Sequence, residues 1–408
     1  MSGGALMELV AYGAQDVYLS GNPQVTFFKQ LYKRHTNFAM QSVEAGFNGS
    51  VGFGKRVSLV VPRVGDLMGR VYLQVTLPSF TSADPVPDNS TVAWVDEVGH
   101  FLINNVEVQI GGQAIDKHYG TWLSIWANLT VDKNKEEGYN AMIGVPGSSP
   151  KFTQPERELY IPLQFFFCRS EGTALPLIAL QYHEVRFTVE FESFANLLGV
   201  DEYGATEAAP TPTLDTARLY IDYYFLDTEE RRRFAQTSHE YLIEQLQFTG
   251  DESLPNGNFG VKLNFNHPVK ELIWVCLGGD RTNNQYEVTE TYEGEDYDVN
   301  PVEQAKLQFN GHDRFSARLG RYFSEVQPWQ HHTNIPSHAG INVYSFALYP
   351  ELEQPSGTAN FSRIDNSTLS ITLNATAKLE ATPYAKIYAV NYNVLRIMSG
   401  MGGLAYSN

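Results

Sequence analysis

Apolar and polar residues alternate with a period of two along several stretches of this chain. In residues 71–77, Val71 and Leu73 occupy one face of an extended chain, and Tyr72 and Gln74 occupy the other. The same alternation recurs at 185–191, 261–266 and 369–374. One apolar and one polar face predict antiparallel strands packed on a core, and argue against the continuously apolar strands of parallel α/β folds.

A β-rich pattern is present twice, once on each side of a short charged segment near residue 230. In the first copy, the run 106–110 reaches Gly111-Gly112 and then Tyr119-Gly120. In the second, the run 305–309 reaches Asn310-Gly311 and then Leu319-Gly320. Two further pairs correspond in the same order, 180–189 with 362–373 and 217–224 with 385–392. This order predicts a duplicated all-β unit, which favours a structural building block over a catalyst.

Helical patterns are few and short. Trp122 and Trp126 have the i, i+4 spacing of a helix that would pack on the first β unit. A second helix is expected around residues 27–31, after Asn22-Pro23. The segment 227–235 begins with a capping aspartate, continues with acids and then with basic residues, as a helix dipole prefers. We expect a linker helix there, between the two β units.

Bulk composition is consistent with two domains. A chain of 408 residues exceeds one ordinary core, and 43% hydrophobic residues can fill two. Only 18% of residues are charged, which suggests that neighbouring molecules cover much of the surface. The net charge of −17 argues against direct binding to nucleic acid, which needs a basic face. The basic run 231–233 follows two glutamates and is interpreted as a solvated helix face or a salt-bridged linker.

The two cysteines, Cys168 and Cys276, make no disulfide framework, and Cys276 lies in an apolar run that predicts a buried, reduced thiol. The first ten residues lack the features of a secretory signal peptide, and no apolar run approaches the length of a membrane span. We therefore expect synthesis in a reducing cytoplasm. Six glycosylation sequons are interpreted mostly as chance matches: Asn48, Asn89, Asn128, Asn360, Asn366 and Asn374.

Two candidate sites for chemistry are outweighed by plainer interpretations. Residues 49–55 have the spacing of a phosphate-binding loop, but Arg56 stands where a Ser or Thr would hold magnesium, and a strand-like run follows instead of a helix. We expect a glycine-rich turn that enters a strand. A metal cluster of His331, His332 and His338 lacks the histidine and glutamate spacing of cupins, and 328–336 is interpreted as a proline-bounded loop.

Three stretches are rich in polar or turn-forming residues and are expected to be loops: 79–89, 200–212 and the acidic 282–301. Weak cation binding is an alternative for the acidic loop. The sequence predicts no catalytic residues, no cofactor-binding residues and no metal-binding residues. The protein is expected not to be an enzyme and to need no cofactor.

Several long motifs are similar to those of one protein family. They are 9–29, 36–39, 174–185, 230–235, 344–350, 354–365 and 395–406. Together they resemble the major capsid proteins of nucleocytoplasmic large DNA viruses, especially those of algal viruses. The resemblance spans the whole chain. It implies an all-β double jelly roll, with two tandem eight-stranded antiparallel sandwiches and a few short helices.

The resemblance also implies an organisation and a set of partners. The expected parts are an N-terminal arm (1–25), a first jelly roll (26–226), a linker helix (227–237), a second jelly roll (238–400) and a C-terminal tail (401–408). Homotrimers with a pseudo-hexagonal outline would tile an icosahedral virion shell. They would contact neighbouring capsomers, minor capsid and penton proteins, and the inner-membrane side through the arm. Outward loops could carry glycans attached by virus-encoded machinery.

Other functions remain as hypotheses. A low-copy minor capsid paralogue would share the same motifs. A carbohydrate-binding surface jelly-roll protein would need an aromatic-lined groove or a calcium site, and the sequence has neither in recognisable form. An enzyme of the cupin type is disfavoured by the missing metal motif.

Overall fold

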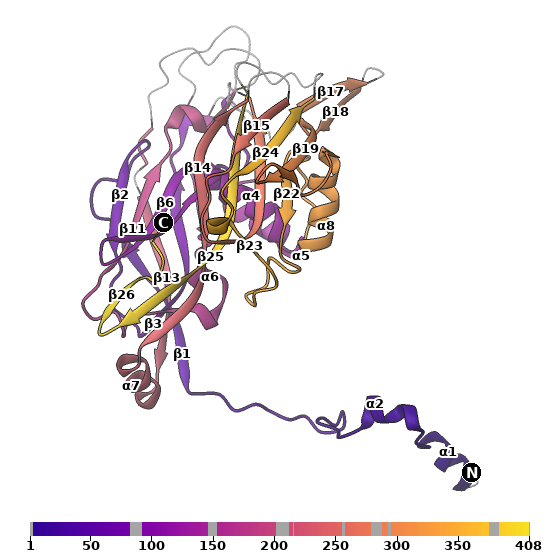
Figure 1. Ribbon diagram of the computed structural model, residues 1–408. Coiled ribbons are helices and arrows are strands. Elements are labelled where there is room, and N and C mark those ends of the chain that lie inside the picture. The colour runs from indigo at the N-terminus through magenta and orange to yellow at the C-terminus, as the bar shows by residue number, and fades with distance from the viewer. Residues whose placement is uncertain are drawn as a thin grey trace. The chain divides into compact units, whose positions relative to one another are not determined.

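The computed structural model describes residues 3–81, 92–145, 153–200, 212–214, 216–254, 258–278, 288–292, 295–374 and 383–407. The chain divides into two compact units, Met1–Asn37 and Phe38–Asn408. The second unit holds both copies of the duplicated pattern (Figure 1). The first unit ends later than the arm expected from the sequence, which was placed at 1–25.

The first jelly roll consists of two antiparallel sheets. The order of one is β1-β13-β3-β10, with β9 also paired to β3, and the order of the other is β2-β11-β6-β7. Their bounds are β1 (Phe38–Gly46), β2 (Arg56–Val60), β3 (Leu67–Leu77), β6 (Ile103–Ile110), β7 (Gln113–Tyr119), β9 (Arg157–Pro162), β10 (Leu175–Pro176), β11 (Val185–Phe191) and β13 (Thr216–Leu226).

The second jelly roll repeats this plan. The order of one sheet is β14-β25-β16-β22, with β23 and β26 at its margins, and the order of the other is β15-β24-β19-β20, with β21. The bounds are β14 (His239–Ser253), β15 (Asn258–Lys262), β16 (Pro268–Leu277), β19 (Val302–Phe309), β20 (His312–Asp313), β21 (Arg318–Leu319), β22 (Asn342–Ser345), β23 (Ala359–Asn360), β24 (Ser367–Leu373), β25 (Tyr384–Met398) and β26 (Met401–Leu404).

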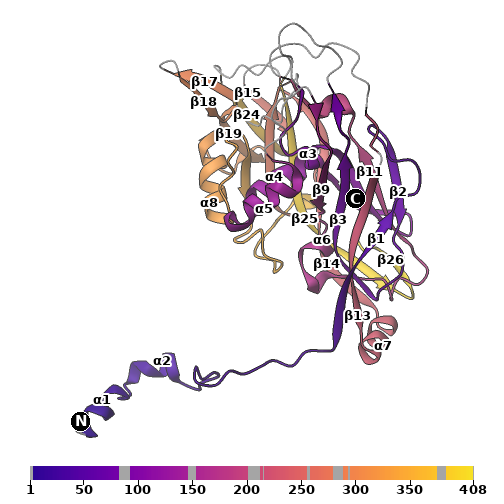
Figure 2. The ribbon, with the colours of Figure 1, turned by 180° about the vertical axis from the view of Figure 1, so that it is seen from behind.

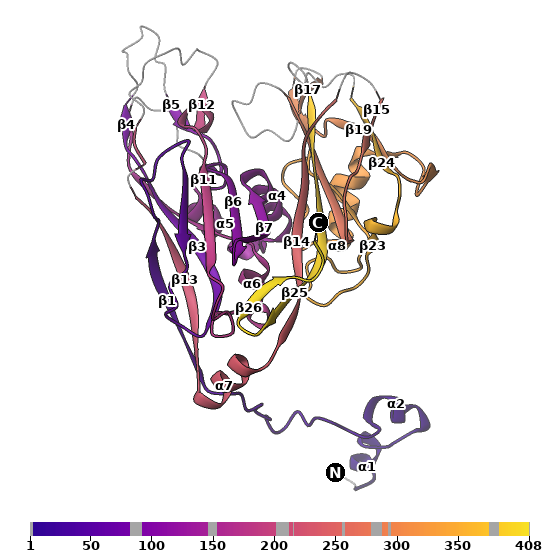
Figure 3. The same ribbon diagram turned by 60° about the vertical axis from the view of Figure 1, so that its left-hand side comes forward.

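The two sheet orders match when short strands that share one position are counted together: β9 with β10, β22 with β23, and β20 with β21. Each sandwich then has eight strands, with β26 as an addition to the second, and the predicted double jelly roll is confirmed. The matched stretches of the sequence occupy matched strands: 106–110 and 305–309 lie in β6 and β19, and 217–224 and 385–392 lie in β13 and β25. Figure 3 shows the two jelly rolls side by side within the second unit.

Three short two-stranded pairings lie outside the main sheets. They are β4 (Phe80–Thr81) with β8 (Thr153–Gln154), β5 (Val92–Trp94) with β12 (Leu198–Val200), and β17 (Val288–Tyr292) with β18 (Glu295–Val299). The last pair corrects the expectation of a loop at 282–301, because its second half forms an antiparallel hairpin. Most of the expected loops at 79–89 and 200–212 lies outside the described residues.

The period-two alternation places apolar side chains in the cores. Val71 and Leu73 of β3 are buried in the first core, and Leu369 and Ile371 of β24 are buried in the second. Burying an aliphatic side chain contributes roughly 1.5–3 kcal/mol, so alternation over many strands supplies most of the driving force. Residues 49–55 are irregular and contain a turn at Phe53-Gly54 just before β2, which confirms the prediction of a turn that enters a strand.

Helices decorate the ends and flanks of the sandwiches. They are α3 (Val98–Phe101), α4 (Gly120–Thr130), α5 (Lys133–Ile143), α6 (Phe166–Arg169), α7 (Thr228–Gln236) and α8 (Gln327–His331), with the short turns η2 (Glu171–Thr173), η3 (Phe194–Leu197), η4 (Tyr322–Val326, π-helical) and η5 (Phe361–Arg363). The helix expected around Trp122 and Trp126 is α4. The described helices include none long and apolar enough to cross a membrane.

The helix between the two jelly rolls is α7. The side chain of Asp227 accepts a hydrogen bond from the backbone N–H of Glu230, with an N···O distance of 2.9 Å, and so caps the helix as its sequence predicts. Glu229 and Glu230 lie in the first turn and Arg233 in the last, an order that suits the helix dipole. Arg231 forms an ion pair with Asp66 at 3.0 Å, which ties α7 to the first jelly roll.

The first unit contains α1 (Gly3–Leu9), η1 (Ala14–Asp16) and α2 (Val17–Ser20). The helix expected at 27–31 is wrong, since only a turn occurs at Phe27 and Phe28. These two side chains are 94% and 99% exposed. A short helix is marginal in water unless packing stabilises it, and the exposure of these two side chains gives no such stabilisation among the described residues.

Two further expectations are corrected. The segment 328–336 is not entirely a loop, because its first part is α8. The C-terminal tail expected at 401–408 contains β26, which pairs with β25. Gly402 of this strand bonds back to the first jelly roll: its carbonyl lies 3.0 Å from Nδ1 of His183. The C-terminal hairpin therefore ties the second jelly roll to the first.

Candidate functional site

The feature with the clearest structural consequence is the junction between the two jelly rolls. Helix α4 of the first jelly roll packs on the sheet β14-β25-β16-β22 of the second. One apolar cluster joins them: Trp122, Ile125, Trp126, Leu129, Ile273, Val275, Leu277, Ile341, Val343, Tyr388 and Val390. Because this cluster contains residues from both sandwiches, it fuses them into one body.

A chain of buried charges lies beside this apolar junction. Glu244 of β14 forms ion pairs with Arg169 of α6, at 2.6 Å, and with Lys270 of β16. The side chain of Lys270 is 1% exposed, and its ammonium group also donates to the carbonyl of Pro350. The guanidinium of Arg169 lies 4.2 Å from the ring centre of Trp126. Glu244 therefore links a cation from each jelly roll.

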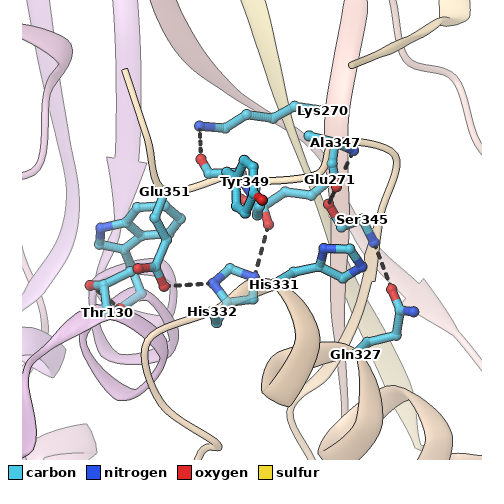
Figure 4. A network of polar contacts seen from close by, with 12 residues as sticks. Thr130, Lys270, Glu271, Gln327, His331, His332, Ser345, Ala347, Tyr349 and Glu351 are labelled. Atoms are coloured by element: carbon cyan, nitrogen blue, oxygen red, sulfur yellow. Dashed lines mark hydrogen bonds and ion pairs between the residues drawn. The ribbon is translucent and has the colours of Figure 1, made fainter. Parts of the chain in front are cut away.

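Glu271, which follows Lys270 on β16, continues the network on the other side of that strand. His332 forms ion pairs with Glu271, at 3.0 Å, and with Glu351, at 2.9 Å (Figure 4). The side chains of His332 and Glu271 are fully buried. Glu351 also accepts hydrogen bonds from the backbone N–H and the hydroxyl of Thr333. These contacts fasten the loop around Glu351 to the end of α8.

The pKa values of the pair follow from this arrangement. Burial by itself would lower the pKa of His332, but the carboxylates of Glu271 and Glu351 outweigh it and raise the pKa from 6.5 to about 9. Burial would likewise raise the pKa of Glu271, and the facing imidazolium outweighs it and lowers that pKa. At neutral pH His332 is therefore a buried cation between two carboxylates.

This pair predicts a loss of stability at alkaline pH. A pKa that is raised in the folded state contributes stability that is fully present below about pH 6.5 and is lost as the pH rises through about 9. The contribution is on the order of 3 kcal/mol. We expect the melting temperature of the wild type to fall across this window more steeply than that of His332→Gln. Parallel curves for the two proteins would show that the imidazole does not titrate in the folded state.

The structure separates the histidines that the sequence placed in one candidate cluster. Nδ1 of His331 lies 3.1 Å from the carbonyl of Leu348, whereas His332 faces two glutamates. Among the residues that the structure describes, no group of three or more His, Cys, Asp or Glu side chains could hold a metal ion. Cys168 and Cys276 are free, and Cys276 is buried as predicted.

Sequence reasoning did not identify the buried charges. Lys270-Glu271 interrupts an otherwise apolar strand, Val269 to Leu277, and both residues are 0% exposed. Charged residues are almost never fully buried unless they are paired, so two adjacent charges inside an apolar strand could have signalled partners elsewhere in the chain.

Large apolar side chains are exposed on the second jelly roll near α8. Trp329 is 72% exposed, and Leu348 and Tyr349 on the neighbouring loop are 64% and 59% exposed. Two side chains of the second jelly roll hold the backbone of this loop in place. His331 contacts the carbonyl of Leu348, and Lys270 donates to the carbonyl of Pro350. Exposed apolar groups on a fixed backbone are typical of surfaces that bind other proteins.

Two jelly rolls fused through a common core define a double jelly-roll protein, an architecture used by virus shells. Residues 26–227 match the family described as the major capsid protein N-terminus, and residues 230–403 match the large eukaryotic DNA virus major capsid protein family. The chain therefore belongs to the major capsid proteins of large eukaryotic DNA viruses. It is a structural component of the virus capsid.

Relatives and solved structures agree with this assignment. The chain is 50% identical to the major capsid protein of Pyramimonas orientalis virus, with 100% of each covered. It is 42% identical to that of Paramecium bursaria Chlorella virus 1, with 99% of this chain and 100% of the relative covered. The protein in the PBCV-1 virus capsid matches with a TM-score of 0.80 and 38% identity, covering 94% of this chain and 100% of that one. The Faustovirus major capsid protein shares the fold, with a TM-score of 0.76, 14% identity and 95% of each chain covered.

Proposed function

We propose that three copies of this chain form a closed trimer of pseudo-hexagonal outline, and that such trimers tile the flat facets of an icosahedral shell. The observation that supports this most directly is the strand-for-strand match of the two jelly rolls. Three chains bring six similar sandwiches together, and cyclic symmetry closes the ring while leaving the outer edges for neighbouring capsomers.

The trimer is tested by the mass of the purified protein in mild buffer at micromolar concentration. We expect the mass of three 45.8 kDa chains. Interfaces of obligate oligomers are large and apolar, so dilution should not dissociate it readily. A stable monomer would refute the trimer.

The N-terminal arm is proposed to act after trimer formation, on the inner side of the shell, towards minor capsid proteins and the inner membrane. The described side chains of the first unit are largely exposed, including Leu9, Tyr18 and Leu19 at 85%, 92% and 89%. Such apolar groups need a partner outside the body of the subunit.

Deleting residues 1–20 is therefore expected to leave the trimer intact and to reduce particle yield strongly. The measurements are the mass of the purified variant and electron microscopy of assembled particles. Replacing the same residues by a glycine and serine linker of equal length is the control for chain length. Loss of the trimer in the deletion would show that these residues belong to the core of the capsomer.

The remaining partners follow from the same proposal. The segment 79–89 and the segment 282–301, which contains the β17-β18 hairpin, are proposed to face outward and to carry any glycans, while penton proteins occupy the vertices. The chain is proposed to be non-enzymatic, to make no direct contact with nucleic acid, given a net charge of −17, and to be made in the host cytoplasm. Mass spectrometry of peptides from purified particles tests the glycans, and their absence from both segments would refute that part.

A further inference from the structure

The duplication extends to a helix whose outer face is exposed among the residues that the structure describes. In the first jelly roll α4 follows β7 and begins at Gly120, and in the second η4 and α8 follow β21 and Gly320. At both positions a larger residue is excluded by the same kind of contact. A Cβ on Gly120 would lie 2.5 Å from the carbonyl oxygen of Ile103, and one on Gly320 would lie against that of Val302. Ile103 and Val302 are the first residues of the matched strands β6 and β19.

The faces of the two helical segments correspond as well. Counted from the two glycines, Leu123 matches Phe323, and each is buried in the core of its own jelly roll. The residues of α4 that pack on the other jelly roll include Trp126 and Leu129. Their counterparts by the same count are Val326 and Trp329, which are 39% and 72% exposed. The second helix thus presents outward the positions that the first one buries.

The sheets of the two jelly rolls differ in a complementary way: the outward face is covered by a helix in the second jelly roll and is partly exposed in the first. Tyr388 of β25 lies opposite Ile273 of β16, and both are covered by α4. In the matched strands Tyr220 of β13 lies opposite Tyr72 of β3. These two tyrosines are only half-buried, and the ring of Tyr160 on β9 lies 6.3 Å from that of Tyr220. The outward face of the first jelly roll therefore carries a tyrosine surface where the second jelly roll receives a helix.

Figures 1 and 2 show α8 on the second jelly roll, near α5 of the first. The segment after α8 contacts α4, since the ring of His332 lies 6.5 Å from that of Trp126, but Trp329 within α8 is 72% exposed. One chain cannot bring its own α8 onto the outward β13-β3-β9 face of its own first jelly roll, because α4 and the common core fix the two sandwiches together. A second copy can supply the missing sheet. The contact would be head-to-tail, and such contacts close into rings when the rotation allows it.

We propose that, in the trimer, η4 and α8 of each copy pack on the outward β13-β3-β9 face of the next copy, as α4 packs on β25 and β16 within the chain. This rests on the proposed trimer and names its contact surfaces. The interchain contact is built from Trp329, Val326 and Tyr322 on one side and Tyr72, Tyr160 and Tyr220 on the other. Trp and Tyr are enriched at protein interfaces. Their apolar rings carry a polar group, which suits a surface that must stay soluble before the subunit assembles.

The first experiment compares Trp329→Asp with Tyr406→Asp by mass measurement of the purified proteins. Tyr406 is 63% exposed and serves as a matched control, since its backbone carbonyl rather than its ring is hydrogen-bonded. We expect Trp329→Asp to be a folded monomer with an unchanged circular dichroism spectrum, and Tyr406→Asp to remain a trimer. A wild-type monomer would refute the trimer itself. A trimeric Trp329→Asp that fails only to form particles would place this helix in contacts between capsomers and overturn the proposal.

The second experiment tests the pairing of the two surfaces without disrupting them. Trp329→Cys and Tyr160→Cys proteins are made separately, mixed, unfolded and refolded together, and treated with a short bismaleimide. Cross-linked dimers are expected in the mixture and not in either protein alone, because each contact joins two different surfaces. Dimers from Trp329→Cys alone would indicate a symmetric contact between two helices and would refute the head-to-tail arrangement. An uncross-linked mixture of intact trimers would also refute it.

Discussion

Replacing Glu244 by glutamine is expected to lower the free energy of unfolding by about 3–5 kcal/mol. The substitution keeps the size of the side chain and removes only its charge. Lys270, which is 1% exposed, and Arg169, which is 14% exposed, would then be buried cations without their carboxylate. Since Arg169 belongs to the first jelly roll, we also expect the two sandwiches to unfold less cooperatively. Thermal and denaturant unfolding of the two proteins measure both effects.

The same strand provides a matched control. Glu240, also on β14, forms an ion pair with Arg396 at 2.8 Å, and both side chains are more than half exposed. Glu240→Gln should therefore cost less than about 1 kcal/mol. The double variant Glu244→Gln with Lys270→Met removes the stranded ammonium group and should recover part of the loss. Equal effects of the Glu240 and Glu244 substitutions would mean that the buried network does not stabilise the junction.

The second large effect is expected at Gly120 and Gly320. An added Cβ would collide with backbone carbonyl oxygens in both places, and backbone cannot move aside as a flexible side chain can. We expect Gly120→Ala and Gly320→Ala each to destabilise the protein by about 3 kcal/mol or more, at or beyond the usual range for overpacking. The yield of soluble protein and the melting temperature report this.

Gly138 is the matched control for these substitutions. It lies in α5, and a Cβ there would have no atom within 4 Å. Gly138→Ala should raise stability by roughly 0.5–1 kcal/mol, because alanine restricts the unfolded chain and favours helix. A well-tolerated alanine at Gly320 would contradict the close approach of η4 to β19, and with it the match between the two helical segments.

Local patterns in the sequence were enough to predict the strands and the duplication. Period-two alternation directs alternate side chains to opposite faces, so residues such as Val71 and Leu369 could be assigned to cores before any partner strand was known. The capping aspartate of α7 works within one turn of helix, and it too was predicted correctly. The double jelly roll itself was predicted from the motifs that this chain shares with the capsid protein family.

The tertiary structure decided everything that depends on groups distant in the chain. Lys270 and Glu271 are tolerated inside an apolar strand only because Glu244 and His332 come from other elements, and no local pattern encodes such pairs. The segment around Phe27 has apolar residues at helical spacing, yet among the described residues the side chains of Phe27 and Phe28 are almost fully exposed and no helix forms there. Trp329 is exposed although its counterpart Leu129 is buried, because Leu129 packs on the sheet of the other jelly roll and the side chain of Trp329 stays 72% exposed. Burial is a property of neighbours, whereas alternation is a property of the chain.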